Sequence, residues 1–185
     1  MRALLIVGLL SATAHADRTA TVHLGGQFGG TEEMDPAMAP AMRATGGPRM
    51  TLAWEHQPIS LPTTPGYNFD VTLVPELTGG VMLDEMRGES FAGFGLRGEL
   101  RFGQREQGLL RVSGRGSFYL AGRMMLIGEG QDGLIEGALG TYLYLGASRA
   151  RIGVEIAVAA RERTDVPGDT TQMGVFSSLY LGWAM

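Results

Sequence analysis

Hydrophobic and polar residues alternate with a period of two along most of the chain after residue 17. This period is the signature of β-strands, because successive side chains of a strand point to opposite faces. Gly, Pro and acidic stretches separate the alternating segments. The pattern predicts an all-β fold with eight strands, at about 18–28, 49–57, 67–77, 91–103, 108–125, 134–146, 148–161 and 172–185.

Charged residues keep to one face in the last five segments. In 148–161, for example, Ile152, Val154 and Ile156 alternate with Arg151 and Glu155. Several segments are longer than the ~5–6 residues of an ordinary soluble strand. They match the ~9–11 tilted residues with which a strand crosses a bilayer.

Two architectures produce such a pattern. A soluble sandwich or barrel buries the apolar face, whereas a transmembrane barrel turns it to lipid and encloses the charges. The apolar faces here are long and uninterrupted, and Gly, Ala, Ser and Tyr accompany the charges on the opposite faces. We therefore predict an eight-stranded antiparallel up-and-down transmembrane β-barrel, with a soluble, lipocalin-like exported barrel as an alternative.

The N-terminus has the features of an export signal. Arg2 precedes the apolar run 3–10, and Ala14-His15-Ala16 fits a small-x-small cleavage site. We expect a cleaved signal peptide at 1–16 and a single barrel domain at 17–185.

With this leader, eight amphipathic strands and an amphipathic C-terminal strand, the chain resembles small bacterial outer-membrane β-barrels of the OmpX and OmpA-barrel kind. The last residue on the outward face of the final strand is Met185, after Trp183, where such proteins usually end in an aromatic residue. The resemblance implies a bacterial outer-membrane location, contact with outer-membrane lipid, recognition by the barrel-assembly machinery, and a monomer.

Connection lengths give a second expectation. If the first strand leaves the periplasm, the connections 29–48, 78–90, 126–133 and 162–171 face outward and are long, as in outer-membrane barrels. The periplasmic turns then include the short connections at 104–107 and about 147, with 58–66 as a long exception. Pro75 weakens the third strand, since proline cannot donate to a ladder, and a strand near 80–86 is an alternative.

Composition narrows the chemistry. All 15 basic residues are Arg, Cys is absent, and the net charge of −4 argues against nucleic-acid binding. An eight-stranded barrel has an interior that side chains just fill. We hypothesise that an Arg–carboxylate network plugs the lumen, with Arg123 and Arg161 in water at the rims. The expected network residues are Glu55, Asp70, Glu76, Arg97, Glu99, Arg101, Arg111, Arg115, Glu136, Arg149, Arg151 and Glu155.

Two local features suggest other chemistry. Met34, Met38 and Met42 could hold Cu(I), although a flexible Met-rich loop is the favoured interpretation. His23 and Ser178 share the polar faces of the first and last strands, which would be neighbours in a closed barrel. A membrane-embedded lipid-modifying enzyme or lipid binder is therefore a second alternative. We assign no catalytic residue, cofactor or metal, and expect a structural or surface-interaction role.

Overall fold

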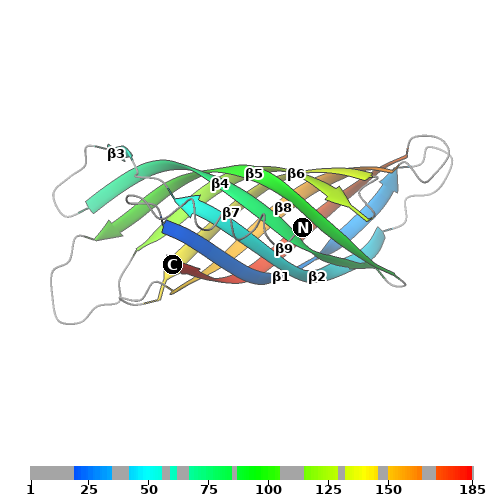
Figure 1. Cartoon of the computed structure of the whole chain (residues 1–185), viewed down its shortest axis with the longest axis horizontal. Coiled ribbons are helices and arrows are strands. Elements are labelled where there is room, and N and C mark those ends of the chain that lie inside the picture. Colours follow the sequence, from blue (N-terminus) through cyan, green and yellow to red (C-terminus); the bar gives the residue numbers. More distant parts are fainter. Residues whose placement is uncertain are drawn as a thin grey trace, which may run out of the picture.

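The computed structural model describes residues 19–34, 42–55, 59–61, 67–84, 87–104, 115–128, 132–145, 150–163 and 170–184. Eight long strands form a tilted barrel, and a short strand, β3, lies at one end of it (Figure 1). The strands are β1 (Thr19–Met34), β2 (Met42–Glu55), β3 (Ile59–Leu61), β4 (Tyr67–Asp84), β5 (Arg87–Gln104), β6 (Gly116–Ile127), β7 (Asp132–Tyr144), β8 (Ala150–Arg163) and β9 (Thr170–Ala184). In the described part of the chain, no helix is long and apolar enough to cross a membrane.

Every described pairing is antiparallel, and consecutive long strands are neighbours. The ring closes where the first strand meets the last, from Thr21 opposite Ala184 to Met34 opposite Thr171. Pairing of β2 with β4 completes the wall, while β3 is an accessory strand on the edge of β4. The predicted closed, eight-stranded, up-and-down antiparallel barrel is confirmed.

The side-chain faces are oriented as the charge pattern predicts. On β8, the outward Ile156 is 60% exposed and Val154 is 51% exposed. Glu155, which lies between them, and Arg151, earlier on the same strand, are buried. The same alternation runs through β6, β7 and β9, where the outward Leu residues are exposed and Tyr, Ala and Ser point inward. Apolar side chains thus cover the outside of the barrel and polar ones fill much of the inside.

Four strands, β1, β2, β4 and β5, are longer than the alternation predicts. The strand β2 begins at Met42 rather than near 49, and the Gly46-Gly47-Pro48 sequence that interrupts its alternation lies inside it. Strand β4 unites the predicted segment 67–77 with its alternative 80–86. Pro75 lies one residue beyond Glu76, where the described pairing of β4 with β2 ends, and remains opposite Leu96 of β5.

The expectation from connection lengths is wrong. Only residues 85–86 separate β4 from β5, where a long outer connection at 78–90 is predicted. Conversely, β5 ends at Gln104 and β6 begins at Gly116, so the predicted four-residue turn at 104–107 is replaced by the interval 105–115.

Candidate functional site in the lumen

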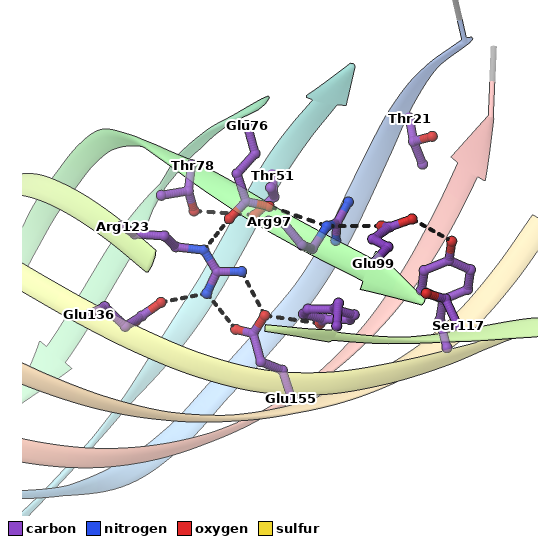
Figure 2. Close-up of polar contacts among 12 residues, drawn as sticks. Thr21, Thr51, Glu76, Thr78, Arg97, Glu99, Ser117, Arg123, Glu136 and Glu155 are labelled. Carbon is purple, nitrogen blue, oxygen red and sulfur yellow. Dashed lines mark hydrogen bonds and ion pairs between the residues drawn. The ribbon is translucent and has the colours of Figure 1, made fainter. Parts of the chain in front are cut away.

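The lumen contains a cluster of buried charged side chains centred on Arg123 of β6. Its guanidinium contacts carboxylates from three other strands: Glu76 of β4, Glu136 of β7 and Glu155 of β8 (Figure 2). Its Nη1 lies 2.5 Å from Glu136 Oε1, and its Nη2 lies 2.6 Å from Glu155 Oε2. Arg123 is 3% exposed, so the sequence-based placement of this residue in water at a rim is wrong.

Arg49 of β2 extends the cluster across the barrel. Its Nη1 and Nη2 donate to the two oxygens of Glu136 at 3.0 and 2.7 Å, the bidentate geometry that suits a guanidinium. Its Nε donates to the Thr78 hydroxyl of β4 at 3.1 Å. Strands β2, β4, β6, β7 and β8 are therefore linked through one group of ion pairs that crosses the lumen.

A second part of the network follows β5. Arg97 Nε lies 3.0 Å from Glu99 Oε1, and Arg101 Nη2 lies 2.8 Å from Glu99 Oε2. Arg97 also lies 3.7 Å from Glu76, which joins this part to the cluster around Arg123. Tyr142 of β7 donates a hydrogen bond to Glu99 at 3.1 Å, across the intervening strand β6.

Glycines on the intervening strands allow these long side chains to meet. Gly95 of β5 is opposite both Glu76 and Arg123, and a Cβ at this position would come within 2.7 Å of Arg123 Cγ. Gly140 of β7 is likewise opposite both Tyr119 and Glu155, and the Tyr119 ring occupies the space of its missing side chain. Tyr119 thereby donates to Glu155 at 2.9 Å across an intervening strand.

Two tyrosine rings contact the guanidinium of Arg151, which lies near the start of β8. The Arg151 guanidinium lies 4.6 Å from the centroid of the Tyr142 ring and 5.2 Å from that of Tyr144. Arg151 Nη2 also donates to the Thr21 hydroxyl at 2.6 Å. Such stacking is energetically favourable when the cation is desolvated, as it is here.

One end of the lumen is apolar, which the sequence argument missed. Phe91, Met125, Ile127 and Leu134 are buried there, together with Met82. These residues lie inward by the same alternation that places the charges, so the signal was present in the sequence. The lumen therefore combines a charged centre with an apolar end.

The predicted network residues divide into three groups. Glu76, Arg97, Glu99, Glu136 and Glu155 are buried and meet, with Arg101 partly exposed beside them and Arg151 among the tyrosines. Asp70 is half-buried opposite Arg101, whereas Arg115 is exposed just before β6, with its guanidinium 5.4 Å from the centroid of the Tyr144 ring. Arg111, Arg149 and the side chain of Glu55 lie outside the described residues.

Arg161 lies near the end of β8. Its side chain is 11% exposed, and its guanidinium pairs with Asp132 at 2.5 Å and with Glu89, whose side chain is 37% exposed, at 2.6 Å. This is an ion pair at the mouth of the barrel, in contact with solvent. Arg49 and Arg123 were the partners that sequence reasoning omitted, although both share the inward parity of their strands.

Catalysis by His23 and Ser178 finds no geometric support. His23 stacks on Tyr180 with ring centroids 4.6 Å apart, and neither its Nε2 nor Ser178 Oγ has a hydrogen-bond partner. Both face a cavity of only about 20 Å³, enough for a water molecule or two but not for a lipid. Among the described side chains, no group of three His, Asp or Glu could hold a metal ion. The side chains of Met34, Met38 and Met42 lie outside the described residues.

No protein-family model matches the sequence, and no curated protein matches it. Among solved structures, the outer-membrane enzyme PagL is 15% identical, with 84% of this chain and 97% of that chain covered and a TM-score of 0.45. Neisserial surface protein A is 7% identical, with 89% and 98% covered and a TM-score of 0.42. The outer membrane protease OmpT from Escherichia coli is 10% identical, with 91% and 96% covered and a TM-score of 0.34.

Two of these neighbours are described as outer-membrane enzymes and the third as a surface protein. Their identities and TM-scores are too low to transfer an activity, and they include both enzymes and a surface protein. The function of this chain has to be argued from its own lumen and outer surface.

Proposed function

We propose that this chain is an integral outer-membrane barrel whose lumen is closed to ions and solutes, with a structural or surface-interaction role rather than a catalytic one. The observation that carries the proposal is Arg123, which bonds to carboxylates from three other strands in the middle of the lumen. A chain of side chains that crosses the barrel in this way leaves no continuous aqueous path at its level.

The outer surface supports insertion into a bilayer. On β9, Met173, Val175, Leu179, Leu181 and Trp183 all point outward and are exposed. At ~3.3 Å per residue and a tilt near 45°, this run spans roughly 23 Å along the barrel axis, close to the ~25 Å apolar band of outer-membrane barrels. We call the outward apolar side chains of the barrel its apolar belt. A surface of this kind is stable in contact with lipid rather than water.

The alternatives are less well supported by the geometry. A soluble carrier needs an apolar interior and a charged exterior, whereas here Arg97 and Glu99 are enclosed and Ile156 is exposed. A lipid-modifying enzyme needs an activated nucleophile, and His23 and Ser178 are not hydrogen-bonded to one another. Export through a signal peptide at 1–16, assembly by the barrel-assembly machinery and a monomeric state belong to the same proposal.

Conductance across a planar lipid bilayer tests the closed lumen. The folded wild-type protein is expected to leave the conductance at that of the bare bilayer, because the ion pairs span the lumen. A stable open channel in the wild-type protein would overturn the proposal.

A matched pair of double variants sharpens this test. Arg49→Ser with Glu136→Ser removes a bidentate pair from the centre without changing the net charge, and is expected to produce small conductance steps. Arg161→Ser with Asp132→Ser removes a pair at the mouth and is expected to remain silent. The heat-modified mobility of each variant on a gel confirms that it has folded.

A further inference from the structure

A groove of about 640 Å³ lies on the outside of the barrel, near the end where β6 ends (right in Figure 1). It crosses β5, β6, β7 and β8 and reaches the start of β9. This volume is in the range of about 300–1,000 Å³ typical of ligand sites. The groove is distinct from the charged centre of the lumen, because Arg49, Arg123 and Glu136 do not line it, whereas Met125 and Leu134 of the apolar end do.

Small residues form a depression between larger ones in this groove. Ala92, Gly133 and Ala160 line it, and a Cβ added at Gly133 would meet no atom within 4 Å. The larger outward side chains beside them include Phe94, which is 62% exposed, and Ile135, which is 62% exposed. The depression is thus long, apolar and open to the surroundings of the barrel.

One end of the groove is polar. The outward side chains of Glu162 and Thr171 are exposed there. Arg161 also belongs to the lining, but its guanidinium already bonds to Glu89 and Asp132. The lining therefore offers a carboxylate and a hydroxyl to a ligand, and its arginine is occupied by protein carboxylates.

We propose that this groove binds one lipid molecule with an ammonium headgroup, its acyl chain along Gly133 and Ile135 and its headgroup at Glu162. This inference rests on the proposed function, since a lipid-facing belt is what makes a lipid the occupant. The groove is polar at the membrane boundary and apolar toward the middle of the belt, which matches the orientation of a lipid. The exposed carboxylate favours an ammonium group over an anionic head, for which the lining has no uncommitted cation.

Native mass spectrometry of the full chain in detergent tests the site, with phosphatidylethanolamine and phosphatidylglycerol of identical acyl chains as probes. The wild-type protein is expected to retain one phosphatidylethanolamine in preference to phosphatidylglycerol. Gly133→Phe fills the depression and is expected to lower the retained lipid by about tenfold, a change equivalent to ~1.4 kcal/mol. Glu162→Gln is expected to remove the headgroup preference while leaving the acyl chain bound.

Leu179→Phe, on the outward face of β9 away from the groove, is the matched control and is expected to retain lipid like the wild type. Equal retention by Gly133→Phe and Leu179→Phe overturns the site, and equal retention of the two lipids by the wild type overturns the headgroup assignment. Solubility without detergent is a separate result, because it would overturn the membrane location itself. The two failures are therefore distinguishable.

Discussion

The centre of the lumen and its apolar end fill the same barrel by different means. At the centre, Arg123 and Arg49 meet carboxylates from three other strands, so each contact fixes a particular pair of atoms. At the apolar end, Phe91, Met125 and Leu134 occupy space without directional bonds. The comparison indicates that the centre specifies which side chains face one another, whereas the end requires mainly the right volume.

Removing the central guanidinium should have the largest effect. Arg123→Ala leaves three buried carboxylates without their shared partner, and breaking a buried pair in this way costs about 3–5 kcal/mol. Urea unfolding of the protein in lipid vesicles measures the loss of stability. Arg161→Ala removes two carboxylate contacts at the mouth, one of them to the exposed Glu89, and is expected to cost less than Arg123→Ala in the same titration. Equal costs for the two variants would contradict the distinction between centre and mouth.

A cavity at the apolar end should come next. Leu134→Ala removes buried methyl groups, and its cost is expected in the lower half of the ~2–5 kcal/mol range for such changes. The same urea titration measures it, with the outward-facing Leu139→Ala on the same strand as a control for strand propensity and lipid contact. If Leu139→Ala were as costly as Leu134→Ala, the apolar end would not be acting as a packed interior.

Glycine substitutions test how the centre is assembled. Gly95→Ala places a methyl group 2.7 Å from both Arg123 Cγ and the Gly122 carbonyl oxygen, so the arginine and the neighbouring backbone have to shift. Overpacking of this kind costs about 1–3 kcal/mol. Gly122→Ala on β6 faces outward into open space and provides the control. Unchanged stability of Gly95→Ala would show that the long side chains do not depend on the missing Cβ.

The smallest effect is expected from a conservative exchange at the apolar end. Met125→Leu keeps both the volume and the apolar character, and such exchanges usually cost less than ~1.5 kcal/mol. The corresponding exchange at the centre, Arg123→Lys, loses the planar fork and should cost more than Met125→Leu in the same titration. The reverse order would show that the centre, too, is specified only by volume and charge.

The face on which each side chain lies was predictable from the sequence. Successive side chains of a strand point to opposite faces, and the charged residues of 148–161 and 91–103 mark the inner face. The contacts between side chains in the lumen were not predictable. The alternation shows which face a residue lies on, but not its position along the barrel axis. This position depends on the register around the ring, which placed Arg123 opposite Glu136 in the centre rather than at a rim. The inward glycines, such as Gly95 between Glu76 and Arg123, mark the places where long side chains meet, and they could have been used to predict these contacts.

The strand ends were harder to predict for a different reason. The alternation is interrupted at Gly46-Gly47-Pro48 and at Pro75, where local sequence opposes a strand but neighbouring strands extend it. Tertiary pairing outweighs such local preferences. The same effect lengthened β4 and removed the long connection that the sequence suggested at 78–90.

The seam between β1 and β9 constrains how this chain acquires its shape. Its partners, from Thr21 with Ala184 to Met34 with Thr171, come from opposite ends of the polypeptide. The chain has to lose conformational entropy by closing a long loop before contacts between such distant positions can form, and this makes folding slow. Until the final strand arrives, the first strand has an unsatisfied edge that invites aggregation. A newly made chain therefore needs protection of this edge until the ring closes, and truncation of the last strand should leave an open sheet that is prone to aggregate.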